Sequence, residues 1–137
     1  MNLLGRCKIV PAVVPTAGAA TGMTEAEIDC TGFDRICYVI GTGAAASGAT
    51  IDFQLQDAVA TGMANAADIT DAALTQVEAA TGASACYAID VRINPARLFH
   101  KPVGVVGTDT FANFAFAILY EGSGTYPKTA ATQAVIV

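Results

Sequence analysis

The sequence contains no tryptophan, a single histidine and only four tyrosines among its 137 residues. Carbohydrate-binding sites usually stack sugar rings on exposed aromatic side chains, so this composition disfavours a carbohydrate-binding module. The histidine, His100, stands in an apolar stretch, and no serine of the chain lies in a G-x-S-x-G motif. We therefore expect a protein that is not an enzyme, with no catalytic residues and no cofactor.

The cysteines are also few and are not spaced for metal binding. Cys7, Cys30, Cys37 and Cys86 form no C-x-x-C pair. A structural zinc site normally begins with such a pair and needs further cysteine or histidine ligands, which one histidine does not supply. We expect four small, mostly buried apolar side chains. A disulfide and a metal site are the two alternatives.

Two other candidate ligand sites lack the required residues. Asp68, Asp71 and Glu78 do not have the spacing of a calcium-binding loop. The segment 41–48, Gly-Thr-Gly-Ala-Ala-Ala-Ser-Gly, has the glycines of a phosphate loop without its lysine, and a strand pattern follows where a helix should begin. We expect no metal or cofactor site, and a loop between strands at 41–48.

Charge is scarce as well: 14% of the residues are charged, and the formal net charge is −5. The seven lysines and arginines are scattered singly, so we expect no direct binding of nucleic acid. No apolar run approaches the roughly 18 residues of a membrane span, and residues 1–8 do not resemble a secretory signal. We expect no membrane contact and synthesis in a cytoplasm. An alanine-rich, weakly charged surface suits burial against neighbouring subunits, although a GC-rich genome also raises the alanine content.

Strand patterns dominate what is present. A turn at Thr31-Gly32 leads into an apolar strand at residues 33–40, in which both alternating rows carry apolar side chains. Such a strand is expected to be covered on both faces. Residues 50–57 alternate strictly, with Ile51, Phe53 and Leu55 on one side, which predicts an antiparallel sheet with one face exposed to water.

Further strands are predicted at regular intervals. Residues 24–30 indicate a short strand, and residues 86–93 alternate. Asp90 and Arg92 share one face of that strand and are expected to pair with Arg97 or Asp34 across the sheet. Pro102 places the strand 98–106 at a sheet edge or a bulge. Residues 68–80 fit either a helix or two short strands, and the thin apolar stripe favours extended structure. In the strand 111–120, the expected core residues are Phe114, Phe116, Ile118 and Tyr120.

Seven to nine short strands with such turns predict an all-β fold, an antiparallel, jelly-roll-like β-sandwich with extended N- and C-terminal arms. We divide the chain into an N-terminal arm or edge strand (1–23), a sandwich domain (24–127) and a C-terminal tail (128–137). The apolar side chains of both arms are the candidates for contact with a partner, by strand addition or apolar packing. They are Leu3, Leu4, Ile9, Val13, Val14, Val135, Ile136 and Val137. Deletion of residues 1–14 is expected to leave residues 25–127 folded.

The order of these elements resembles a class of small structural proteins encoded among the head genes of tailed bacteriophages. The resemblance rests on three segments. They are Asp29-x-x-Gly32-Phe33-Asp34 before an apolar strand, Ile51-x-Phe53-x-Leu55-Gln56, and Ile89-Asp90-Val91-Arg92 followed by Arg97 and a closing Phe116-Ala-Ile-Leu-Tyr120 strand.

The resemblance implies a capsid decoration or cement protein, located on the capsid surface of the virion after assembly in the host cytoplasm. Its partners would be the major capsid protein and copies of itself, bound through many weak contacts. Another head–tail or tail component is the first alternative, and a carbohydrate-binding or adhesion module is the second.

Overall fold

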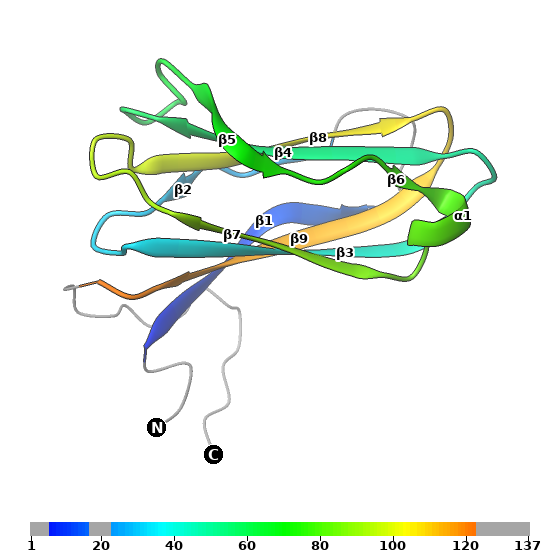
Figure 1. The fold of residues 1–137 in the computed structure, drawn as a ribbon, viewed down its shortest axis with the longest axis horizontal. Coiled ribbons are helices and arrows are strands. Elements are labelled where there is room, and N and C mark those ends of the chain that lie inside the picture. The colour runs from blue at the N-terminus through cyan, green and yellow to red at the C-terminus, as the bar shows by residue number, and fades with distance from the viewer. Residues whose placement is uncertain (1–5, 17–22, 123–137) are drawn as a thin grey trace.

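The structure, a computed structural model, describes residues 6–16 and 23–122. They form two antiparallel sheets packed face to face (Figure 1). Sheet A has the order β1 (Cys7–Thr16), β9 (Phe111–Tyr120), β3 (Arg35–Ala45) and β7 (Cys86–Arg92). Sheet B has the order β2 (Ile28–Asp29), β8 (Phe99–Gly107), β4 (Thr50–Ala58) and β5 (Ala67–Ala73), with β6 (Val77–Glu78) also paired to β4.

The connections are those of a jelly roll. With β6 set aside, the chain crosses from one sheet to the other at every step except between β4 and β5, which lie together in sheet B. The first and last strands, β1 and β9, pair with each other over most of their length. Eight strands in two four-stranded sheets with this order are a jelly roll. The predicted all-β, jelly-roll-like sandwich is confirmed.

The core lies between the two sheets. Ile51, Phe53 and Leu55 of β4 point inward, as their alternation predicted, and they face Ile36 and Tyr38 of β3. All five side chains are at most 2% exposed. Burying side chains of this size contributes roughly 1.5–3 kcal/mol each, which makes this layer the main source of stability.

The apolar strand predicted at residues 33–40 begins later and continues further. Strand β3 runs from Arg35 to Ala45, so the loop predicted at 41–48 is wrong in its first half. Thr42 anchors the extension: its hydroxyl donates to the carbonyl oxygen of Gly82 and accepts the Ala85 amide at 2.9 Å. Pairing with β9 and this long-range anchor keep the glycine-rich segment extended.

The region predicted as either helix or extended is extended. Residues 67–73 form β5 and residues 77–78 form β6, and a short helix, α1 (Ala79–Gly82), follows. Strand β5 is irregular, because a bulge interrupts its pairing with β4 and Asp71 has a φ of 60°. An irregular edge strand is a poor template for unwanted pairing with other chains.

Strand β1 is an edge strand of sheet A, and it is also part of the core. Val10, Ala12 and Val13 are buried against the rest of the sandwich. The amide of Ala26 donates to the carbonyl oxygen of Ala12 at 2.9 Å, which closes this side of the sandwich. Deletion of residues 1–14 would therefore expose the core, so the expectation that this deletion leaves the domain folded does not hold.

Pro102 lies where strand β8 has no neighbour on one side, in agreement with the sheet edge predicted from the proline. Strand β2 pairs with β8 only at Phe99 and His100, and it ends before Pro102. On that side β8 is an edge, where the missing proline amide costs no ladder hydrogen bond. Pro102 is fully buried and lies opposite Leu55 of β4.

The strand 111–120 has the predicted bounds, but its predicted core row is wrong. Alternate side chains of β9 from Phe111 to Leu119 point into the core, including Ala115 and Ala117. The predicted row lies on the opposite side, where Phe114 is 41% exposed. Alanines fit the inner row because bulky side chains of β3 and β4 already fill the space between the sheets.

His100 is buried inside the sandwich, 1% exposed, and neither ring nitrogen has a hydrogen-bond partner. Burial lowers the pKa of its imidazole from 6.5, and the negative charge of Asp57 opposes this shift. The folded protein therefore holds His100 neutral, while the unfolded chain binds a proton below about pH 6.5.

Stability is thus expected to be complete above pH 6.5 and to fall as the pH drops from 6.5 toward the lowered pKa of the folded state. Urea denaturation of the wild type and of His100→Leu at pH 7.5, 6.5 and 5.5 tests this, since the leucine variant has no imidazole to protonate. In the leucine variant, we expect the free energy of unfolding to be the same at all three pH values. Asp29, whose pKa is lowered from 3.8 by hydrogen bonds from Thr31, titrates below this window. An equal slope in both proteins would assign the effect to other groups.

Candidate interaction surface

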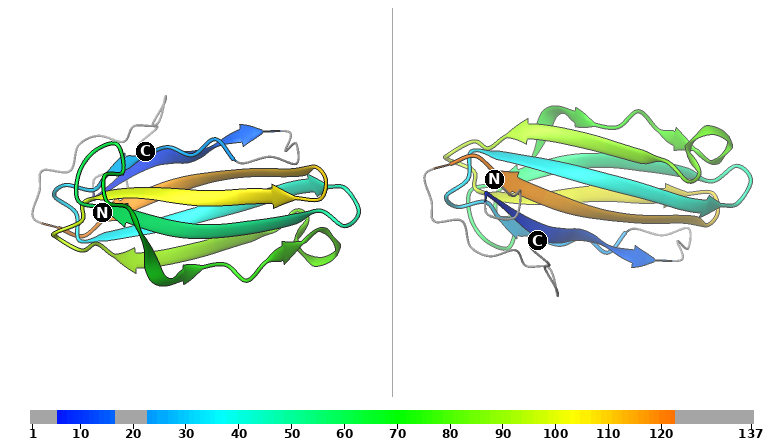
Figure 2. Two further views of the ribbon diagram at one scale, coloured as in Figure 1. Left: turned by 90° about the horizontal axis from the view of Figure 1, so that it is seen from above. Right: turned by 90° about the horizontal axis from the view of Figure 1, so that it is seen from below.

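The candidate functional site is the outer face of sheet A, the side turned away from sheet B. Its four strands lie side by side in the view from below (Figure 2, right). The strand registers bring together side chains from four distant parts of the sequence. They are Cys7, Ile9 and Pro11 of β1; Phe114, Phe116, Ile118 and Tyr120 of β9; Arg35, Cys37, Val39 and Gly41 of β3; and Cys86, Ala88, Asp90 and Arg92 of β7.

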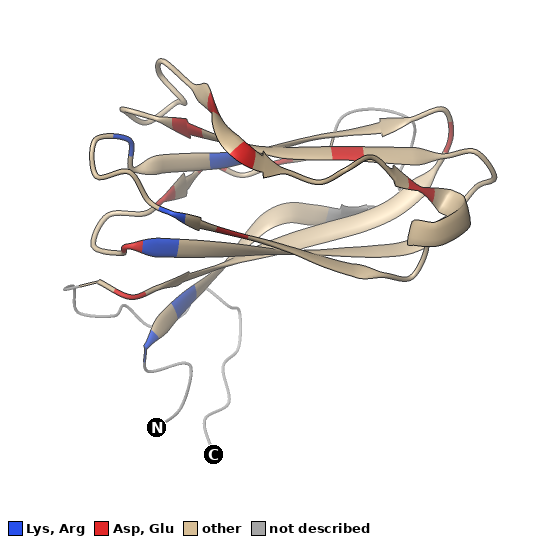
Figure 3. Ribbon diagram, viewed as in Figure 1, with Lys and Arg blue, Asp and Glu red and all other residues tan. Residues whose placement is uncertain are grey.

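The middle of this face is apolar. We call the following side chains the apolar patch: Ile9, Pro11, Val39, Phe114, Phe116 and Ile118. Phe116 lies at its centre, between Pro11 and Val39 in register. The charge-coloured ribbon has no charged residue in the middle of β3 and β9 (Figure 3). A contiguous apolar surface of this kind marks an interaction site more often than it serves a monomer.

The ring of Phe114 lies over Gly41 on the neighbouring strand. A Cβ atom at Gly41 would be 2.3 Å from two ring carbons of Phe114, so no larger residue fits beneath the ring. The ring covers the glycine backbone while its other side stays open, and Phe114 remains 41% exposed. Phe114 is therefore a supported, solvent-facing aromatic anchor, the kind of residue that dominates binding energy at interfaces.

The polar side chains of this face gather at one end of the sheet. Arg35 donates to the Tyr120 hydroxyl and to the Asp90 carboxylate, at 2.9 Å each, and the Tyr120 hydroxyl donates to Asp90. Hydrogen bonding to Asp90 raises the pKa of Tyr120, so the hydroxyl stays protonated. The expected pairing of Asp90 and Arg92 with Arg97 or Asp34 is wrong, because Asp90 pairs with Arg35 and Arg97 pairs with Asp57.

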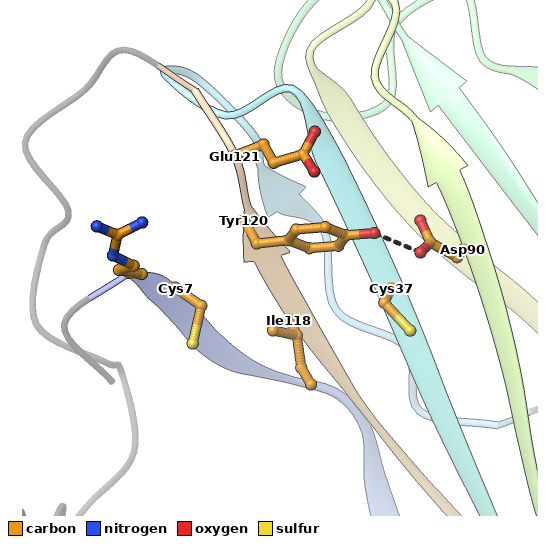
Figure 4. A pocket seen from close by; sticks show the side chains of 7 residues that line it. Cys7, Cys37, Asp90, Ile118, Tyr120 and Glu121 are labelled. Carbon is orange, nitrogen blue, oxygen red and sulfur yellow. Dashed lines mark hydrogen bonds between the residues drawn. The ribbon is translucent and has the colours of Figure 1, made fainter. Parts of the chain in front are cut away.

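This polar cluster borders a shallow hollow of about 430 Å³ (Figure 4). The residues that line it are Arg6, Cys7, Cys37, Asp90, Ile118, Tyr120 and Glu121. The Arg35–Asp90 ion pair is exposed and screened by water, so the cluster serves mainly to orient these side chains. The hollow can accept an apolar side chain from a partner, with hydrogen-bonding groups at its rim.

The outer face of sheet B has a different character. Asp52, Gln54 and Gln56 of β4 point to water, as predicted. Gln56 donates to Asp68 at 2.8 Å, and Gln76 donates to Asp52 at 2.9 Å. These side chains satisfy one another on the surface. The outer row of β8 adds Val103 and Val105 beside these polar side chains, and Val105 is 51% exposed. The outer face of sheet B is therefore mixed, whereas the middle of the outer face of sheet A is apolar.

The predicted partner-contact residues are distributed unevenly. Ile9 lies in the apolar patch, and Val14 is 49% exposed. Val13 is 2% exposed and belongs to the core, so its side chain does not reach a neighbour. The remaining candidates lie outside the described residues; they are Leu3, Leu4, Val135, Ile136 and Val137.

The patch residues of β9 were missed because the sequence places apolar side chains in both rows of that strand. One signal was available. Strand 33–40 also has two apolar rows, and two-sided strands in neighbouring positions indicate a sheet with two apolar faces. In the structure the row of β3 containing Cys37 and Val39 is only half-buried. The second cover expected for this strand does not come from the described part of the chain.

The cysteines are all free. Cys7 and Cys30 are buried as expected, whereas Cys86 is exposed. Burial raises the pKa of Cys30, and the negative charge of Asp29 adds a smaller increase, to about 12. This thiol is therefore unreactive.

Among the described residues, no group of three histidine, cysteine or acidic side chains is arranged to hold a metal ion. The search for a helix long and apolar enough to cross a membrane also found none in residues 6–16 and 23–122.

No protein-family model and no curated protein matches this sequence. Among solved structures, the chain is similar to a chain in the structure of infectious bursal disease virus, strain Gx, with a TM-score of 0.51 and 14% identity. The match covers 89% of this chain and 34% of the viral chain, so this chain spans about a third of that chain's length. At this identity the likeness concerns the fold, and it agrees with the sandwich described above.

Proposed function

We propose that this protein is a non-enzymatic structural component of a virion. The observation that carries the proposal is the difference between the two outer faces of the sandwich. A shell subunit needs a surface that packs against neighbours, and the apolar patch of sheet A is such a surface, whereas the outer row of β4 in sheet B is polar. The fold-level likeness to a chain of a virus structure supports the same role.

More specifically, we propose a decoration or cement protein on the head of a tailed bacteriophage. The sequence resemblance described above supports this choice. In this role the protein binds the outside of the capsid through the major capsid protein and copies of itself. Many weak contacts around a closed shell add up to strong binding, and the shell then resists the internal pressure of packaged DNA.

Jelly rolls occur both in capsid proteins and in lectins, so the fold alone does not decide between a structural role and carbohydrate binding. The surface favours the structural role. The largest exposed apolar side chains of the described residues are Val14, Val59, Val105 and Phe114, only one of which is aromatic. A sugar-binding site would be expected to present several aromatic rings.

The test is to locate the protein in purified particles of the phage that encodes it. We expect many copies per particle, accessible to antibody on intact heads, and a matching jelly-roll density on the outer capsid surface by electron microscopy. Particles from a gene deletion should release their DNA at a lower temperature than the wild type. Density in the tail would support the alternative of a tail component, and absence from particles would contradict the proposal. Specific binding on a glycan array would revive the adhesion alternative.

A further inference from the structure

The outer face of sheet A points to a second copy of this chain as its occupant. We propose that two copies pack through this face about a two-fold axis that lies in the interface, perpendicular to the strands, and passes through Phe116. The two β9 strands then run antiparallel across the interface, as in an isologous dimer. This inference rests on the same apolar patch as the proposed function and names a second copy as the neighbour that packs on it. Dimerisation is measured in solution, so it can fail while the protein is still found in virions.

The first argument is shape. Phe114 and Ile118 lie two residues on either side of Phe116 in the same row of β9. Rotation about the proposed axis places Phe114 of one copy over Ile118 of the other. Phe114 is 41% exposed, and Ile118 lines the hollow. The exposed ring and the hollow therefore occupy symmetry-related positions on the same face.

The second argument is charge. The formal net charge of −5 opposes self-association in general. On the outer face of sheet A, however, the registers place Arg35, Arg92 and Asp90, and Arg6 and Glu121 line the hollow at the same end of the sheet. The antiparallel arrangement keeps the arginine ends of the two copies apart and leaves both at the polar rim. A parallel arrangement would bring the two arginine ends together.

The third argument is size. Four strands at a spacing of about 4.8 Å and ten residues of β9 at about 3.4 Å each give a face of the order of 650 Å². This area is close to the roughly 800 Å² per partner of a standard protein interface. Within one copy, sheets A and B already pack through their apolar inner faces. In the dimer the two A sheets would pack through their outer faces in the same way, which gives four stacked sheets.

Sedimentation velocity of the full chain at 1–100 μM measures the association. We expect a species of twice the 13.9 kDa chain mass. Phe114→Asp should raise the dimer dissociation constant about 30-fold or more, because it places a charge in a central apolar contact. Val105→Asp is the matched control, since Val105 is 51% exposed on sheet B, and it should leave the constant unchanged. Circular dichroism checks that both variants are folded.

Disulfide trapping tests the symmetry in a background with Cys37→Ser and Cys86→Ser, because both thiols lie on this face. Phe116→Cys should link to its own copy on mild oxidation, and Phe114→Cys mixed with Ile118→Cys should form the mixed dimer. Val105→Cys should not link. A wild type that is monomeric at 100 μM, or a dimer unaffected by Phe114→Asp, would overturn the proposal. Efficient linking of Ile118→Cys to itself would also overturn it, because the proposed axis through Phe116 places Ile118 opposite Phe114 of the other copy.

Discussion

Replacing Leu119 with alanine is expected to lower the free energy of unfolding by about 3 kcal/mol, whereas Ile118→Ala should cost less than about 1 kcal/mol. The two residues are neighbours in β9 and have similar size. Leu119 is fully buried between the sheets, so its truncation leaves a cavity in the core. Ile118 lies on the outer face of sheet A, where water fills the space that its side chain leaves.

Urea denaturation of the two variants and the wild type at pH 7.5 provides the comparison. It should be done at a protein concentration low enough to keep the chain monomeric, so that any association through the outer face does not add to the cost of Ile118→Ala. The sequence pattern alone predicted the reverse order, with Ile118 in the core. Equal costs, or a larger cost for Ile118→Ala, would mean that β9 faces the other way.

Arg97→Met should lower the free energy of unfolding by about 2 kcal/mol. The guanidinium is bonded to the carboxylate of Asp57, and it donates at 2.7 Å to the backbone carbonyl oxygens of Asp57 and Asn65. The side chains of Arg97 and Asp57 are only 22% and 13% exposed, so water compensates poorly when the pair is broken. Methionine keeps much of the apolar stem and removes every donor.

Lys101→Met is the matched control for this substitution. Lys101 is 3.9 Å from Glu25 and its side chain is 34% exposed, so loss of this ion pair should cost at most about 0.5 kcal/mol. Chemical denaturation measures both variants. If Arg97→Met cost no more than Lys101→Met, the Arg97 contacts would contribute nothing to holding the end of β4 against the following loop.

Much of the fold was predictable because it depends on local patterns. The strict alternation of residues 50–57 identifies an antiparallel strand and its buried face, and both are confirmed in β4. The position of Pro102 indicates an edge, and the structure has one there. The long extension of β3 through Gly41 and Gly43 was not predictable. It depends on pairing with β9 and on the Thr42 anchor, both of which come from residues at least 40 positions away.

The candidate surface was less accessible to sequence reasoning, because its residues come from β1, β3, β7 and β9. Strands β1, β3 and β9 by themselves each present only a second, largely apolar row, which a buried strand also presents. The Arg35–Asp90–Tyr120 cluster joins three of these strands, and only their registers bring it together. The contact residues in the arms were predicted from their apolar character, which core residues share. Val13 is apolar and belongs to the core.

The amino-acid sequence by itself determined that this chain is an antiparallel β-sandwich of short strands, because alternation and turn residues act within a few positions of the chain. It also determined that the surface is weakly charged and rich in small residues. Only the tertiary structure decided which row of β9 is inside. Both rows are apolar enough to be buried, and the choice depends on the volume left by Tyr38, Phe53 and their neighbours in the facing strands. That choice turns Phe114, Phe116 and Ile118 outward and creates the face on which a partner is expected to dock.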